Sequence, residues 1–147
     1  MSFEKAFAFS IKWEGGDKIT DDPDDPGGLT RFGISKRAHP DVDIRNLTEQ
    51  QAKAIYLASY YEKAGCDQLP EPLDMVHFDA AVNAGVSRAE GWLHEALNAN
   101  PDHPAVPYMQ AREAYYAKLA HQKPTMQKYL VGWIRRCTDL RKAAGVL

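Results

Sequence analysis

The sequence contains little cysteine and no long apolar run, and each absence excludes a class of protein. Two cysteines among 147 residues, Cys66 and Cys137, cannot form a disulfide framework, and we expect two reduced thiols. No stretch approaches the roughly 18 consecutive apolar residues of a membrane-spanning helix. The first residues also lack a basic segment leading into an apolar run, so we expect no secretory signal and synthesis in the cytoplasm.

The chain also lacks a large net charge. Eighteen Lys and Arg residues against 20 Asp and Glu give a formal charge of −2, which argues against a nucleic-acid partner. The distribution is uneven, however, because residues 112–147 carry eight basic residues and two acidic ones. Residues 17–25 contain five Asp residues and one Lys. The sequence therefore predicts an acidic segment near its beginning and a basic C-terminal region.

Motifs for metal or phosphate chemistry are missing as well. The five histidines form no HExxH or other closely paired pattern, so no metal site and no cofactor are expected. No Cys–His pairing indicates a peptidase, and no glycine-rich phosphate loop is present. The chemistry of this chain is therefore expected to come from carboxylates and hydroxyls.

Apolar spacing predicts helices through most of the chain, in one mainly α domain. We expect helices at 2–14, 48–64, 73–84, 87–97, 108–121 and 125–144. Capping boxes at Thr48–Gln51 and Ser87–Glu90 are expected to begin two of them. Residues 17–34, rich in Asp, Gly and Pro, are predicted to be irregular or to form a short β-hairpin. Trp133 lies in the apolar stripe of the last helix, where packing is favoured over sugar stacking.

Glu14 does not fit its surroundings in the first predicted helix. At about 100° per residue, it lies only about 20° from Phe3, in the middle of the apolar face. Partial burial and the negative end of the helix dipole both raise the pKa of a carboxyl at this position. A carboxylic acid that stays protonated near neutral pH is suited to general-acid catalysis. The alternative is a surface Glu at a frayed helix end.

Further carboxylates follow within a short distance. Asp24 and Asp25 come directly before Pro26 and a Gly27–Gly28 pair, and Thr30 follows. Turn chemistry explains the Asp, Pro and Gly residues individually, but not so many carboxylates beside a candidate acid. Hydrolysis of a glycosidic bond needs a carboxylic acid and a second carboxylate. The segment therefore favours a glycoside hydrolase, with a hydroxyl that helps to hold the attacking water.

Taken together, these motifs resemble the phage-endolysin muramidases of glycoside hydrolase family 108. The resemblance rests on the runs Trp13-Glu14-Gly15-Gly16, Asp25-Pro26-Gly27-Gly28-Leu29-Thr30-Arg31-Phe32-Gly33-Ile34-Ser35, Phe78-Asp79-Ala80-Ala81-Val82-Asn83-Ala84-Gly85 and Gly132-Trp133-Ile134-Arg135-Arg136. It implies a lysozyme-like single domain over residues 1–147. Residues 1–65 would carry the catalytic motif, and residues 66–147 would form a peptidoglycan-associated helical half.

The same resemblance implies roles for individual residues. Glu14 would be the general acid that cleaves the β-1,4 bond between N-acetylmuramic acid and N-acetylglucosamine in peptidoglycan. Asp25 matches the second carboxylate and Thr30 the hydroxyl, while the adjacent Asp24 is the rival for the second role. Asp24, Gly28 and Asn83 are expected to bind the glycan. Asn83 would contact the N-acetyl groups of the sugars. The alternative for Asn83 is a hydrogen bond to the backbone near the end of its helix.

As an endolysin, such a protein would act on the cell wall or periplasm of the host after holin-type release. We expect a monomer whose partner is the glycan strand. For the basic C-terminal region the default is a solvated helix face, and the functional alternative is an electrostatic contact with the envelope. Two alternatives stand beside this function. A lytic transglycosylase would cleave the same bond and leave an anhydro product, and a non-catalytic module would bind peptidoglycan without cleaving it.

Overall fold

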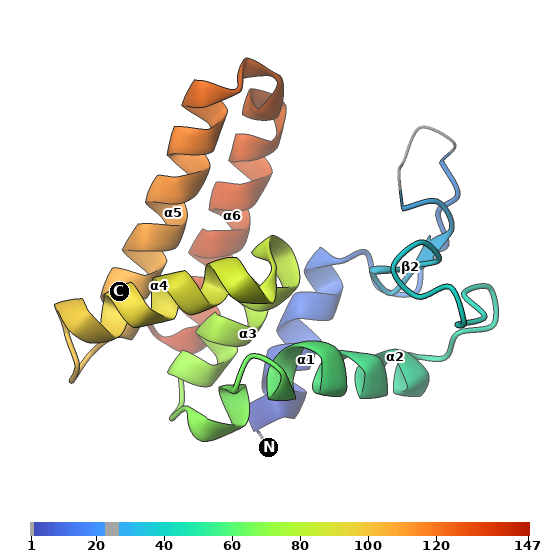
Figure 1. Ribbon diagram of the computed structural model, residues 1–147, viewed down its shortest axis with the longest axis horizontal. Coiled ribbons are helices and arrows are strands. Elements are labelled where there is room, and N and C mark those ends of the chain that lie inside the picture. Colours follow the sequence, from blue (N-terminus) through green and yellow to red (C-terminus); the bar gives the residue numbers. More distant parts are fainter. Residues whose placement is uncertain (1, 23–26) are drawn as a thin grey trace.

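The computed structural model describes residues 2–22 and 27–147, and this part of the chain is mainly helical with one short two-stranded sheet (Figure 1). In chain order the elements are α1 (Ser2–Trp13), β1 (Thr30–Arg31), β2 (Ile34–Ser35), α2 (Glu49–Tyr56), the π-helix η1 (Leu57–Glu62), the 3-10 helix η2 (Cys66–Gln68), α3 (Leu73–Ala84), α4 (Val86–Ala99), α5 (Ala105–Gln122), the 3-10 helix η3 (Pro124–Met126) and α6 (Gln127–Ala144). The predicted mainly α fold with a short β-hairpin is confirmed.

The core is built around α3, which is buried on all sides. Nine successive residues, from Leu73 to Ala81, are buried, as expected of a helix surrounded by other elements. The helices α1, α4, α5 and α6 all contact it. On the α1 side, the ring of Phe3 packs edge-on against Tyr61 and Phe78, with centroids 5.1 and 5.8 Å away. This aromatic cluster fixes α1 against α3 and the end of the α2–η1 segment.

Helices α5 and α6 lie side by side as an antiparallel hairpin on one side of the molecule, while the β pair lies on the opposite side (Figure 1). The C-terminal end of α1 is located between these two regions (Figure 1). A stripe on α6 packs inward through Cys137 and Leu140, which are both fully buried. Cys66 and Cys137 are both free and buried.

Two glycines end α1 and leave Glu14 at its last turn. Gly15 has a φ of 95°, and the amide of Gly16 donates to the carbonyl of Ile11 at 3.0 Å. The Glu14 amide still donates to Ser10 at 3.1 Å, as in a helix. This is the Schellman pattern, which satisfies the last carbonyls of a helix with glycine in the left-handed region. Glu14 is therefore held by regular helical geometry, not at a frayed end.

Three helical boundaries differ from the prediction. The capping box at Thr48–Gln51 is present, but the one at Ser87–Glu90 is wrong because α4 begins at Val86 with Gly85 as its cap. Helix α5 begins at Ala105, so that Pro107 occupies its first turn, where a missing amide costs little. The segment after α2 winds as a π-helix, which sequence periodicity did not predict.

None of the helices formed by residues 2–22 and 27–147 combines the length and the apolar character that a membrane crossing needs.

Candidate active site

Glu14 is a half-buried carboxyl at the junction of several elements. Its side chain is 25% exposed, so it keeps a route to solvent while most of it is covered. Burial raises the pKa of Glu14 above its ordinary value, whereas the nearby Arg136 lowers it and Asp79 raises it. The direction agrees with the prediction from the helix face. A carboxyl in this state can hold a proton and deliver it to a leaving oxygen.

The tip of the β-hairpin contacts Glu14 directly. Strands β1 and β2 pair Arg31 with Ile34, which leaves Phe32 and Gly33 as a two-residue turn. Both turn residues have positive φ, 52° and 71°, as a type I′ turn requires. A Cβ atom placed on Gly33 would lie 2.8 Å from Cβ of Glu14 and 2.5 Å from the hydroxyl of Tyr56. Only glycine fits at this contact.

Phe32 keeps this unusual backbone conformation because its surroundings hold it. A non-glycine residue in the left-handed region costs on the order of 1–2 kcal/mol. The Phe32 ring is buried, its amide donates to Gly16 at 3.0 Å, and its carbonyl accepts from the Tyr56 hydroxyl at 2.7 Å. The hairpin is thus tied both to the segment that follows Glu14 and to α2. Strain that is held in place beside a candidate catalytic group is typical of functional sites.

A buried ionic cluster lies on the other side of Glu14. Atom Nη1 of Arg136 is 3.6 Å from Oε1 of Glu14. The same guanidinium donates to Asp79 through Nη2 at 2.8 Å and through Nε at 3.1 and 3.2 Å. Asp79 also contacts Nη1 of Arg112 at 2.9 Å and accepts from the Ser10 hydroxyl at 2.7 Å. The two guanidinium groups hold the pKa of Asp79 below its usual range despite complete burial.

Asn83 belongs to the same cluster. Its Oδ1 atom accepts from Nη2 of Arg112 at 3.1 Å and from the hydroxyl of Tyr116. The side chain is partly buried at the last turn of α3. Asp79 and Asn83 share the partner Arg112, so the two side chains lie on the same face of α3. The amide nitrogen of Asn83 is the group that would donate to a bound glycan.

Thr30 and Gly28 lie in and before the strand that leads to the hairpin turn. Thr30 is half-buried, pairs with Ser35 and forms a bridge with Thr20. Its hydroxyl donates to the carbonyl of Gly28 at 3.0 Å, and Gly28 has a φ of 67° with open space around its Cα. The two rivals for the second carboxylate, Asp24 and Asp25, lie outside the described residues.

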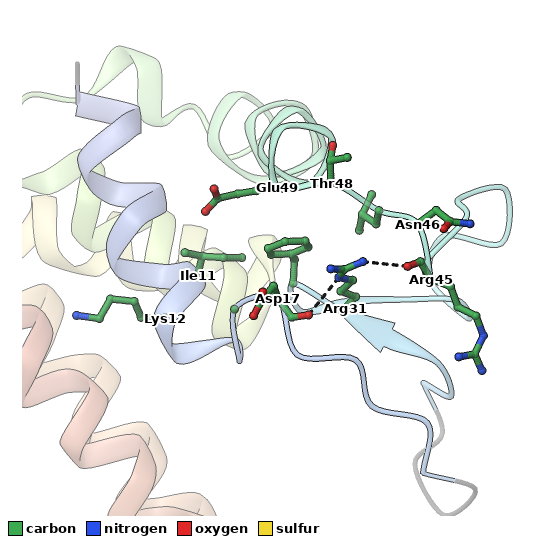
Figure 2. Close-up of a pocket in the computed structure, with 11 residues that line it drawn as sticks. Ile11, Lys12, Asp17, Arg31, Arg45, Asn46, Thr48 and Glu49 are labelled. Atoms are coloured by element: carbon green, nitrogen blue, oxygen red, sulfur yellow. Dashed lines mark hydrogen bonds between the residues drawn. The ribbon is translucent and has the colours of Figure 1, made fainter.

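A hollow of about 640 Å³ opens beside the hairpin, toward the beginning of α2 (Figure 2). Its wall is formed by the end of α1 and the residues after it, by the hairpin, and by the segment that leads into α2. The lining residues are Ile11, Lys12, Gly16, Asp17, Arg31, Phe32, Arg45, Asn46, Leu47, Thr48 and Glu49. Figure 2 shows that Arg31 spans it, donating to the carbonyls of Asp17 at 3.1 Å and Arg45 at 2.9 Å. Glu14 and Thr30 do not line this hollow. Arg31 thus braces the segment after Glu14 against the loop before α2.

Sequence reasoning missed the partners of Glu14. Arg136 was part of a recognised motif but received no role, and Gly33 and Tyr56 received none either. One signal was present, because Ser10 is a polar residue on the apolar face of α1 and bonds the buried Asp79. Trp133 packs as predicted. Its ring stacks on Tyr116 with centroids 5.0 Å apart, and the centroid of the Tyr129 ring lies 5.8 Å from that of Trp133.

Among the described residues, no group of three His, Cys, Asp or Glu side chains is placed to bind a metal ion.

Two comparisons with known proteins found a match, one for the fold and one for the family. A solved structure, SagA of Brucella abortus, is 24% identical to this chain with a TM-score of 0.76, and the alignment covers 97% of this chain and 92% of that one. At this identity the likeness establishes the fold. No curated protein matches the sequence. The family described as Glycosyl hydrolase 108 matches residues 7–85, which include Glu14, the hairpin and Asp79. Because this match spans more than half of the chain, the protein belongs to the glycosyl hydrolase 108 family, and membership implies a glycosidase that acts on peptidoglycan.

Proposed function

We propose that this chain is a muramidase that hydrolyses the β-1,4 bond between N-acetylmuramic acid and N-acetylglucosamine, with Glu14 as the general acid. The observation that carries the proposal is the environment of Glu14. Its carboxyl is held at the last turn of α1, is only 25% exposed and has a raised pKa. Such a group gives its proton to the leaving oxygen as the glycosidic bond breaks.

The remaining roles are assigned from the sequence motifs. Asp25 is proposed as the second carboxylate, with Asp24 as its rival, to activate water or to stabilise the oxocarbenium-like transition state. Thr30 is proposed to hold the attacking water, since its hydroxyl is already oriented by the Gly28 carbonyl. Gly28 and Asn83 are proposed to contact the glycan. Because Oδ1 of Asn83 accepts from Arg112, the amide nitrogen of Asn83 is the atom that would donate to the glycan.

Product analysis of digested peptidoglycan tests the proposal. The wild-type protein is expected to release muropeptides with new reducing ends, and Glu14→Gln is expected to release none while keeping its helical circular dichroism spectrum. Glu4→Gln is the matched control, because Glu4 lies on the same helix, is exposed and pairs with Lys53. Full activity of a folded Glu14→Gln protein would refute the role of Glu14.

The same assay separates the alternatives. A lytic transglycosylase would yield 1,6-anhydro products, which differ from hydrolysis products by the mass of one water. A non-catalytic module would sediment with peptidoglycan without releasing reducing sugar, and Glu14→Gln would leave its behaviour unchanged. Asp24→Ala and Asp25→Ala are expected to differ sharply in residual activity, and equal values would refute the choice of Asp25.

We further propose that the protein is a phage endolysin, monomeric, that reaches the wall from the cytoplasm through a holin-type lesion. Of the eight basic residues in residues 112–147, Arg112, Arg136 and Arg141 are engaged in ion pairs. The exposed cations that remain for an anionic envelope are Lys118, Lys123, Lys128, Arg135 and Lys142. Expression in bacterial cytoplasm is expected to cause lysis only after the inner membrane is permeabilised, and lysis without permeabilisation would contradict the release step.

A further inference from the structure

Four charged side chains, three from helices α3, α5 and α6 and one directly after α1, meet at the C-terminal end of α1. Asp79 on α3 and Arg112 on α5 are fully buried, Arg136 on α6 is 5% exposed, and Glu14 is 25% exposed. Charges are rarely buried unless they are paired. Two carboxylates here face two guanidiniums, so the cluster is neutral when Glu14 is ionised and carries one positive charge when Glu14 is protonated.

The contacts within the cluster are distributed unequally. Arg136 donates to Asp79 over 2.8–3.2 Å from two of its nitrogens, whereas its approach to Glu14 is 3.6 Å, beyond hydrogen-bond distance. Asp79 is itself fixed by Ser10 at 2.7 Å and by Arg112 at 2.9 Å. Arg136 is therefore bound to Asp79 first and reaches Glu14 only with its remaining nitrogen.

We propose that Asp79 and Arg136 are positioning residues for the general acid, and that Asp79 holds the Arg136 guanidinium away from Glu14 so that Glu14 keeps its proton. The inference rests on the proposed function of Glu14. A close, two-pronged ion pair between Arg136 and Glu14 would favour the carboxylate and remove the acid from its working state. Because Asp79 pairs with Arg136, it neutralises most of the charge of this guanidinium. The guanidinium still lies close enough to stabilise the Glu14 carboxylate that forms when the proton is delivered.

Titratable and charged groups on several other elements face Glu14. Asp79 on α3 opposes its ionisation, and Arg136 on α6 and Arg112 on α5 favour it. Tyr56 at the end of α2 and Tyr60 in η1 lie near its carboxyl, and burial followed by the Glu14 charge raises the pKa of both, so they stay neutral. The two arginines and Asp79 are thus the charged groups that act most strongly on the Glu14 carboxyl.

The test measures the titration of Glu14 in variants of opposite sign. Asp79→Asn keeps the shape of the side chain but frees Arg136, and is expected to lower the midpoint by about one pH unit. Arg136→Gln removes the cation and is expected to raise it. Carbon-13 NMR of the Glu14 carboxyl, assigned by its loss in Glu14→Gln, gives the midpoint without substrate. The basic limb of the kcat/KM profile, where the acid loses its proton, is expected to move in the same direction.

Arg141→Gln is the matched control, because Arg141 lies one turn further along α6 and pairs with Glu113 instead. It is expected to leave the midpoint unchanged. A purely structural role for Arg136 or Asp79 would lower the stability without moving the midpoint, and midpoints that stay fixed or move in the same direction in both variants would overturn the proposal. If Asp79→Asn fails to fold, Arg136→Gln alone decides, since an upward shift supports the proposal and no shift overturns it. Activity in folded Glu14→Gln would instead refute the proposed function, and the NMR midpoint distinguishes the two failures.

Discussion

Replacing Gly33 by Ala introduces a single methyl group at the one contact where the hairpin turn meets the candidate acid. The new Cβ atom would lie 2.5 Å from the Tyr56 hydroxyl, 2.8 Å from Cβ of Glu14 and 3.3 Å from its Cγ. Two of these distances are shorter than real Cβ contacts allow, so something must move. Tyr56 is buried and bonded to Phe32, which leaves Glu14 and the turn as the parts that yield.

The cost has two sources that can be separated. Alanine in the left-handed region costs on the order of 1–2 kcal/mol. Overpacking by one methyl group adds about 1–3 kcal/mol. Gly65→Ala supplies the matched control, because Gly65 has a φ of 74°, close to the 71° of Gly33, and nothing lies within 4 Å of its added Cβ. Gly65→Ala is therefore expected to show only the backbone cost.

The two variants are compared by their free energy of unfolding in denaturant and by their turnover of peptidoglycan. Gly33→Ala is expected to lose more free energy of unfolding than Gly65→Ala, by the overpacking cost alone. Its turnover is expected to fall on the order of 100-fold because a displacement of about 1 Å at a catalytic group has that effect. Gly65→Ala is expected to keep near-normal turnover. Equal losses in the two variants would refute the argument that Gly33 is required by its contact with Glu14.

Three further predictions concern the same site. Tyr56→Phe removes the donor to the Phe32 carbonyl and is expected to cost about 1–3 kcal/mol in denaturant unfolding, and unchanged stability would contradict the bracing role of this bond. Thr30→Val is expected to slow turnover about tenfold, the equivalent of one hydrogen bond, whereas Thr30→Ser is expected to keep the wild-type turnover. Equal turnover in the two variants would contradict a role for the Thr30 hydroxyl. Because the pKa of Glu14 is raised in the folded chain, its contribution to stability is present at low pH and is lost as pH rises through that pKa. Glu14→Gln is thus expected to gain thermal stability over the wild type as the pH rises from the ordinary Glu pKa of about 4.3 through the raised pKa of Glu14, and parallel pH profiles would contradict the shift.

Local patterns predicted the parts of this site that depend on one helix. The angular position of Glu14 on α1 placed it on the apolar face, and the glycine pair predicted where the helix ends. The Thr48–Gln51 box predicted the beginning of α2 because both of its bonds are local. The mainly α fold followed from the same periodicity, and it needed no knowledge of tertiary contacts.

Features that depend on distant contacts were not predictable. The turn residues Phe32–Gly33 differ from the Asn–Gly pair that a type I′ turn favours, and their conformation is maintained by Gly16 and Tyr56 from outside the hairpin. The pairing of Arg136 with Asp79 joins α6 to α3 across a long stretch of chain. Helical spacing places Arg136 beside the apolar stripe of α6 and Arg135 on the opposite face, but it does not identify Asp79 as the partner. At Ser87 a local capping signal was overridden, because Gly85 provides the sharp turn between α3 and α4.

The distance along the sequence between Glu14 and Arg136 has a consequence for when the protein can work. Glu14 directly follows the first helix, but the guanidinium 3.6 Å from its carboxyl is in the last one. During translation, a chain that has not yet released α6 from the ribosome has the catalytic motif but not this partner. Truncation within α5 would have the same effect, because the whole of α6 would be missing. We therefore expect activity only after the last helix has been synthesised, because α6 also supplies the fully buried Cys137 and Leu140, and a chain without α6 is expected to lack the packing that positions Glu14.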